Sequence, residues 1–288
     1  MNKNIETFLG CDKDYAPSRV VVFGAPFDST ASYRPGARFA PKTMRAESYS
    51  IETYSPYIDK DLVEDAAVFD GGDLELCFGD TEKALEDIYK FAEKIIKDDK
   101  FPFLIGGEHL VSLPAIKAAY EKYPDLRLVH FDAHTDLRDD YLGAKLSHAT
   151  VIRRAHDFLG DGRIFQFGIR SGDKPEFLWA KNHTRLTKVN FVGLEDTLAE
   201  IADKHVYLTV DLDVLDPAVF PGTGTPEAGG VSFRELLNAV TMVFNNVDVV
   251  GCDMVELSPP LDPNGISTAT ALKLMREVLF LADGKKSG

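Results

Sequence analysis

The chain reads LRLVHFDAHTD from Leu126 to Asp136, an apolar run that ends in polar side chains two residues apart. A β-strand points alternate side chains to the same side, so residues i, i+2 and i+4 of an extended segment converge on one point. A helix with this spacing would spread them apart. The spacing therefore predicts a buried strand over Leu126–Phe131 that delivers Asp132, His134 and Asp136 to one place.

Two further apolar runs end in the same way. Asp211 and Asp213 follow the run Val206–Val210, and His109 follows the run Phe101–Ile105 within the segment GGEH at 106–109. An aspartate at a strand end often only caps the next turn or helix, and a lone loop histidine is usually solvated. Two acidic clusters after buried strands, accompanied by two histidines, favour the two halves of one metal site.

Composition indicates a globular α/β enzyme of one domain over residues 1–288, a length near the upper limit for a single core. The net charge of −14 argues against nucleic acid or an anionic membrane as a partner. Three scattered cysteines without CxxC spacing fit a reducing compartment. Neither a signal peptide nor a run of about 20 apolar residues is visible. We therefore expect a cytoplasmic protein.

Apolar strand-like runs alternate with helical patterns along the chain, which is typical of a parallel sheet with crossover helices. Helices are expected over Thr81–Lys97, where apolar residues form one stripe, over about 232–245 after a capping box at Ser232 and Glu235, and over about 268–282. The expected strands are Val20–Phe23, Ala66–Phe69, Phe101–Ile105, Leu126–Phe131, Ile164–Phe167, Val206–Val210 and Val247–Val255.

Open parallel sheets bind ligands beyond the carboxyl ends of their strands. Polar residues follow four of the expected strands: His109, the cluster at 132–136, the pair Asp211 and Asp213, and Glu256. The fold class therefore predicts that they share one edge of the sheet. The Pro- and Gly-rich loop at 216–230 follows directly and is expected to line the mouth of the site.

The expected ligands are two imidazoles and four carboxylates, namely His109, His134, Asp132, Asp136, Asp211 and Asp213. An oxygen-rich set favours hard ions such as Mn²⁺ over a structural zinc ion. Because carboxylates can bridge, two ions about 3.5–4 Å apart are the natural geometry. Four carboxylates then balance two divalent cations, so that the cluster would activate a bridging water without repelling a cationic substrate.

The same segments resemble those of the ureohydrolases, the family of arginases and agmatinases, and are most similar to those of agmatinases. The similar segments are GAPFD at 24–28, RPGAR at 34–38, GGEH at 106–109, FDAHTD at 131–136, DLDVLDP at 211–217, GTGTPE at 222–227 and DMVELSPP at 253–260. The resemblance implies a three-layer α/β/α sandwich with a mostly parallel sheet, two Mn²⁺ ions and a homotrimer or homohexamer. The implied reaction is hydrolysis of agmatine, a small cationic guanidino compound, to urea and putrescine.

The resemblance also implies a role for each ligand. One manganese ion would be bound by His109 and Asp136, and the other by His134 and Asp213. Asp132 and Asp211 would bridge the two ions.

Two further residues receive catalytic roles from the resemblance. Glu256 matches the glutamate that holds the substrate, and a carboxylate suits bidentate contact with a guanidinium. His148, in the segment SHAT at 147–150, matches the proton-shuttling histidine, although Ala149 stands where the family usually has glycine. The other histidines, His130, His156, His183 and His205, are interpreted as structural.

The implied mechanism follows from the weak electrophilicity of a guanidinium carbon. A bridging hydroxide attacks this carbon while Glu256 holds the guanidinium. Asp136 hydrogen-bonds the hydroxide, and His148 helps to protonate the departing amine, because a neutral amine leaves far better than an amide anion.

The far end of the substrate is less well determined by the sequence. Acidic side chains in LRDDY at 137–141 disfavour a substrate carboxylate, whereas Arg138 has the opposite effect. Agmatine ends in an ammonium group, for which the candidate partners are Asp139, Asp140, Asp173 and Glu176.

Other functions compete with this interpretation. Within the family, the chain could be a guanidinobutyrase, an arginase or a formiminoglutamase. A single-zinc amide deacetylase on a related fold is disfavoured by the presence of both His109 and Asp136. An inactive paralogue that binds a metal or a partner protein usually lacks a ligand or catalytic residue, whereas all eight expected positions are filled here.

Overall fold

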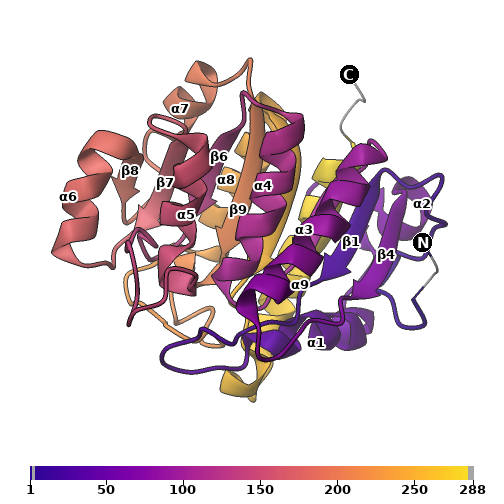
Figure 1. Cartoon of the computed structure of the whole chain (residues 1–288). Coiled ribbons are helices and arrows are strands. Elements are labelled where there is room, and N and C mark those ends of the chain that lie inside the picture. Colours follow the sequence, from indigo (N-terminus) through magenta and orange to yellow (C-terminus); the bar gives the residue numbers. More distant parts are fainter. Residues whose placement is uncertain (2–3, 285–288) are drawn as a thin grey trace.

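Parallel strands form the central sheet of this computed structural model, which describes residue 1 and residues 4–284 (Figure 1). Within the described residues the sheet has eight strands in the order β4-β1-β5-β10-β9-β6-β7-β8. They are β1 (Val20–Gly24), β4 (Val68–Asp73), β5 (Phe101–Ile105), β6 (Arg127–Phe131), β7 (Ile164–Ile169), β8 (Arg185–Lys188), β9 (His205–Asp211) and β10 (Asp248–Val255). A separate antiparallel pair joins β2 (Tyr54–Ser55) to β3 (Lys60–Asp61).

Helices cover both faces of the sheet and give three layers (Figure 1). One face carries α3 (Thr81–Lys97), α4 (Ser112–Lys122) and α5 (Val151–Leu159). The other carries α1 (Ala40–Glu47), α7 (Leu194–Glu200), α8 (Phe233–Asn246) and α9 (Ile266–Asp283). The short α2 (Leu62–Asp65) follows β3, and α6 (Lys174–His183) packs against β8. The expected three-layer α/β/α sandwich is confirmed.

Every expected strand and helix is present, and its ends differ from the prediction by at most four residues. The elements that were not predicted are the strands β2, β3 and β8 and the helices α1, α2, α4, α5, α6 and α7. Strand β8 was missed because its residues, RLTK, are half-buried or exposed and contain no apolar run. Strand β4 continues beyond the predicted end at Phe69 to Asp73. The polar Asp70 ends the apolar run in the sequence, but in the structure it is buried and paired with the guanidinium of Arg45. Among the described residues, no helix combines the length and apolar character needed to cross a bilayer.

The sheet register brings four strand ends to the same level. Strands β5, β10, β9 and β6 are successive neighbours, with Val255 opposite Asp211 and Met254 opposite Ile105. The turn after β5 has room only for glycine, since a Cβ on Gly107 would lie 1.9 Å from the carbonyl oxygen of Phe27. The polar residues that follow these strands therefore meet at one edge of the sheet.

Candidate metal centre and substrate cavity

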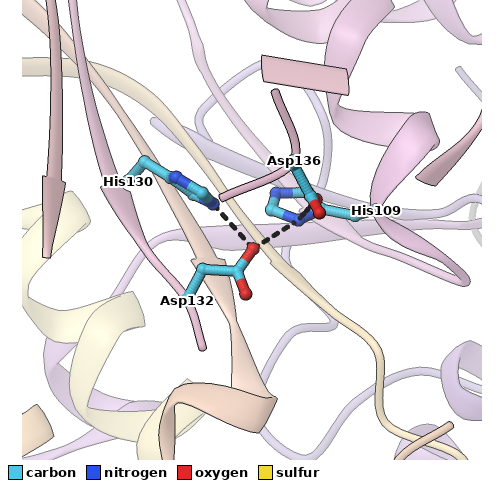
Figure 2. Close-up of side chains that lie close together, drawn as sticks. All are labelled: His109, His130, Asp132 and Asp136. Atoms are coloured by element: carbon cyan, nitrogen blue, oxygen red, sulfur yellow. Dashed lines mark hydrogen bonds and ion pairs between the residues drawn. The ribbon is translucent and has the colours of Figure 1, made fainter. Parts of the chain in front are cut away.

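The first half of the candidate centre surrounds the imidazole of His109, directly after β5. Its Nδ1 lies 3.1 Å from Asp132 Oδ2, 3.1 Å from Asp136 Oδ2 and 3.3 Å from Asp211 Oδ2. Figure 2 shows His109, Asp132 and Asp136 directed toward one another. All four side chains are buried. One nitrogen thus faces three carboxylates, and all of these groups belong to buried side chains.

The second half surrounds His134. Its Nδ1 lies 3.0 Å from Asp213 Oδ2 and 3.5 Å from Asp132 Oδ1. Asp132 therefore directs one oxygen toward His109 and the other toward His134. The Oδ1 of Asp211 accepts a hydrogen bond from the backbone N–H of Asp213 at 2.8 Å, which ties the two aspartates together. The six predicted ligands form one continuous cluster.

The charges of the cluster favour a cation at its centre. Burial lowers the pKa of His109, but the facing Asp132, Asp136 and Asp211 carboxylates outweigh this effect and raise it well above its usual range. Burial, followed by the charge of Asp132, raises the pKa of Asp136 to about 7. Burial and the neighbouring Asp213 raise the pKa of Asp211 strongly. These carboxylates repel one another, and positive charge placed among them relieves the repulsion.

A hydrogen-bond chain behind His109 determines which of its nitrogens carries the proton. Thr209 donates its hydroxyl proton to Asp253 Oδ1 at 2.7 Å. The Thr209 oxygen, 2.9 Å from His109 Nε2, therefore accepts from Nε2–H. In neutral His109 the Nδ1 lone pair then points at the carboxylates, and Nδ1 has no aligned hydrogen-bond partner among the described residues. This is the arrangement of a metal-ligating histidine, and the donor set fits a metal ion.

A second chain supports Asp132 from behind (Figure 2). His130 Nε2 lies 2.7 Å from Asp132 Oδ2, and its Nδ1 lies 3.1 Å from Gln166 Nε2. Thr184 donates to Gln166 Oε1, so the amide nitrogen of Gln166 faces His130 and donates to it. His130 then donates Nε2–H to Asp132. Sequence reasoning missed this contact, although His130 precedes Asp132 by two residues and so lies on the same side of the strand.

A cavity of about 230 Å³ opens beside the cluster. Glu256 lies at its wall, where Oε1 accepts a hydrogen bond from the backbone N–H of His109 at 2.9 Å. Its φ of 66° is a left-handed conformation that is rare for glutamate. The backbone N–H of Glu256 donates to the carbonyl of Gly107 at 2.9 Å, which holds this conformation in place. The carboxylate is thus fixed at the end of β10, facing the cavity.

His148 lies at the cavity wall in a pocket made by the segment after β1. Its Nε2 is 3.2 Å from Ser32 Oγ, and its backbone N–H donates to Thr30 Oγ1 at 3.1 Å. Burial lowers the pKa of His148 to about 4, so the imidazole is neutral at pH 7. Beneath it, the buried Glu108 accepts hydrogen bonds from the backbone N–H and hydroxyl of Thr30. Thr30 and Glu108 were not predicted, because only the fold brings their segments together.

The four carboxylates predicted to meet the ammonium group have different positions. Asp173 and Glu176 line the cavity. Asp139 and Asp140 do not line it: Asp139 pairs with Arg154 at 2.8 Å, and Asp140 accepts a hydrogen bond from the backbone N–H of Gly143.

The two carboxylates at the cavity already have protein partners. Asp173 Oδ2 lies 3.0 Å from Arg138 Nη2, and more than half of its side chain is exposed. Glu176 is buried and accepts hydrogen bonds from the Thr135 hydroxyl and from the backbone N–H groups of Leu137 and Asp173, and thereby caps α6. Asp173 is therefore the more accessible charge of the two.

The loop at 216–230 lies beside the site, as predicted. Thr225 lines the cavity, and Glu227 Oε1 is 3.7 Å from His134 Nε2. The guanidinium of Arg170 donates to the carbonyls of Asp213 at 2.7 Å and Glu227 at 2.8 Å. Arg170 thus connects the loop to the end of β9.

Comparison with known proteins places these features in a family. A profile of the arginase family matches residues 18–281. The agmatinase of Bacillus cereus is 46% identical over 278 residues, which are 96% of each chain. The guanidinobutyrase of Pseudomonas aeruginosa is 34% identical over 273 residues, 91% of this chain and 85% of that protein. A crystal structure of a Clostridium difficile protein superposes with a TM-score of 0.91 at 52% identity, over 94% of this chain and 99% of that chain.

Proposed function

Because this chain belongs to the arginase family, we propose that it hydrolyses the guanidino group of agmatine to urea and putrescine. One observation carries the proposal. Asp132 directs one oxygen to each of two histidines, at the centre of six metal-ligand side chains beside a cavity. A carboxylate in this position suits a pair of ions.

In this proposal, His109 and Asp136 would hold one ion and His134 and Asp213 the other, and Asp132 and Asp211 would be ligands shared by the two. The oxygen-rich donor set suits Mn²⁺, two per chain. Divalent ions bound there would lower the pKa of water, so that a nucleophile becomes available near neutral pH. The inactive-paralogue alternative is disfavoured because the ligand side chains are present and converge.

Glu256 orients the substrate. Its carboxylate, fixed by the backbone N–H of His109, forms charge-assisted hydrogen bonds with the planar guanidinium at the cavity wall. This holds the guanidinium carbon over the cluster, so that attack is effectively intramolecular.

Two residues move protons during the reaction. Asp136, at the cavity side of the cluster, accepts a hydrogen bond from the attacking water, takes up the proton that the water loses and passes it on. His148, neutral at pH 7, relays a proton from solvent to the departing amine. The exposed edge of its imidazole lines the cavity, which gives it access to both.

The substrate's ammonium group extends toward Asp173 at the mouth of the cavity. Arg138 lies at the same wall, but Asp173 at 3.0 Å and Glu176 at 3.6 Å offset its charge. A second candidate substrate, 4-guanidinobutyrate, is favoured by this arginine, which could meet its carboxylate.

We further propose a cytoplasmic homotrimer or homohexamer. The three cysteines are scattered along the chain and form no disulfide bond, which fits a reducing compartment. The oligomeric state is proposed from the family to which the chain belongs.

A urea-release screen tests the function. The purified chain, incubated with Mn²⁺, is offered agmatine, 4-guanidinobutyrate and arginine at equal concentrations. We expect urea from agmatine and little from the other two. Preference for 4-guanidinobutyrate would support the second candidate, and urea from none of them would contradict both.

A further inference from the structure

A second group of metal-ligand side chains lies outside the cavity, where the ends of two helices meet. His156 is in the last turn of α5, His183 is the last residue of α6, and Asp161 lies in the turn after α5. None of the three lines the substrate cavity. Sequence analysis interpreted both histidines as structural, and their separation of 27 positions does not indicate that they meet.

The three side chains converge on one point. His156 Nε2 lies 2.7 Å and His183 Nδ1 lies 2.6 Å from the same oxygen, Oδ1 of Asp161. The three potential ligand atoms all lie within 4.8 Å of one another. Ligand atoms around a tetrahedral zinc ion are roughly 3.3 Å apart, given metal–ligand distances of about 2.0–2.1 Å. The two nitrogen–oxygen distances would have to lengthen by only about 0.6–0.7 Å to reach this spacing.

The indole of Trp179 holds both imidazoles in place. It stacks on His183 with ring centroids 4.2 Å apart, and meets His156 edge-on at 4.7 Å. Side chains that are already ordered lose little conformational entropy when they bind a ligand. Trp179 thus provides a pre-formed arrangement of two nitrogen donors.

The local charges also suit a cation. Both histidines lie at helix C-termini, where the helix dipole favours positive charge. The carboxylate of Asp161, which both imidazoles contact, contributes an acidic oxygen ligand. Arg153 acts in the opposite sense, but its guanidinium lies over the Trp179 ring at 4.0 Å rather than on Asp161.

We propose that His156, Asp161 and His183 bind one divalent transition-metal ion, such as Zn²⁺, at a surface site separate from the substrate cavity. Two imidazoles and a carboxylate form a common zinc ligand set, with water in the fourth position. Asp161 is 65% exposed, so an ion reaches the site directly from solvent. The bound ion links α5, the turn that follows it and α6. This site does not depend on the proposed hydrolase function.

Zinc titration of the Mn²⁺-saturated protein tests the proposal, with a chromogenic chelator reporting free Zn²⁺. The intact chain should bind one more Zn²⁺ than the variants Asp161→Asn, His156→Gln and His183→Gln. If a variant still binds this additional Zn²⁺, its affinity for the ion should be at least about tenfold lower than that of the intact chain. Zn²⁺ should also raise the thermal unfolding midpoint of the intact chain more than that of the variants, because a ligand stabilises the state that binds it. Urea release should be the same in all of them.

Two control variants separate this site from other surface ligands. His205 pairs with Asp125 at 2.7 Å elsewhere on the surface, and Cys77 is an exposed thiol. His205→Gln and Cys77→Ser should leave zinc binding unchanged. Equal zinc binding by the intact chain and by all three site variants would overturn the proposal, as would zinc binding that is lost only in a control variant.

Discussion

Replacing Thr209 tests the metal centre without altering a proposed ligand. Its hydroxyl accepts a hydrogen bond from His109 Nε2 at 2.9 Å and donates one to Asp253 at 2.7 Å, and all three residues are buried. Valine has nearly the same shape but makes neither interaction. Thr209→Val therefore removes the contact that keeps the proton on Nε2 and directs the Nδ1 lone pair at the cluster.

The expected loss follows from the role of such contacts. Removing an outer hydrogen bond to a ligating histidine costs about 10–100-fold in metal affinity. Since each tenfold change equals about 1.4 kcal/mol, the binding free energy should fall by about 1.4–2.8 kcal/mol. The metal-free protein also keeps a buried, unpaired Nε2–H, which should lower the free energy of unfolding by about 1–3 kcal/mol.

Calorimetric titration of the metal-free protein with Mn²⁺ measures the first loss, and urea denaturation measures the second. Thr209→Ser is the matched control, because it keeps the hydroxyl and removes only the methyl group, and its affinity should stay near that of the original chain. An unchanged Mn²⁺ affinity in Thr209→Val would refute the reasoning. Equal weakening by both variants would show that the methyl group, not the hydroxyl, positions His109.

Three further predictions concern the substrate, the fold and pH. Glu256→Gln should lower kcat/KM for agmatine at least about 30-fold, since one partner of a charged pair is lost, while metal content stays the same; loss of metal would contradict its role as a substrate ligand. Gly107→Ala should destabilise the protein by about 1–3 kcal/mol in urea denaturation, because its Cβ meets the Phe27 carbonyl, whereas Gly79→Ala, with open space around it, should have little effect. Burial lowers the pKa of His148 from 6.5 to about 4. Between these pH values the unfolded chain binds a proton at His148 that the folded chain does not bind, so the free energy of unfolding falls as the pH drops from 6.5 to 4. His148→Gln should remove up to about 3 kcal/mol of this pH dependence in denaturation curves at pH 4.5 and 7, and identical pH profiles would contradict the buried, neutral imidazole.

The sequence predicts the ligand cluster because local geometry governs it. Asp132, His134 and Asp136 follow one buried strand, and alternation along an extended backbone is enough to align them. Alternation stops at Asp136, whose φ of 51° turns the chain. Asp139 and Asp140, the candidate partners of the ammonium group that follow this turn, do not line the cavity.

The supporting residues were not predictable in this way. Thr209 and Asp253 lie within apolar strands. Thr209 meets His109, and Asp253 meets Thr209, only because β9, β10 and β5 pair in an order that the linear sequence does not reveal. His156 and His183 likewise meet only because α6 packs against β8, the edge strand of the sheet. Contacts of this kind depend on strand order and helix packing rather than on residue spacing.

The central claim is that the carboxyl ends of β5, β6, β9 and β10 hold a pair of adjacent cations. Anomalous diffraction from crystals grown with Mn²⁺ measures this directly. We expect two peaks about 3.5–4 Å apart, one beside His109 Nδ1 and one beside His134 Nδ1, with Asp132 between them. A single peak at this site would contradict the account. Manganese bound only elsewhere on the protein, with these side chains still hydrogen-bonded to one another, would contradict it as well.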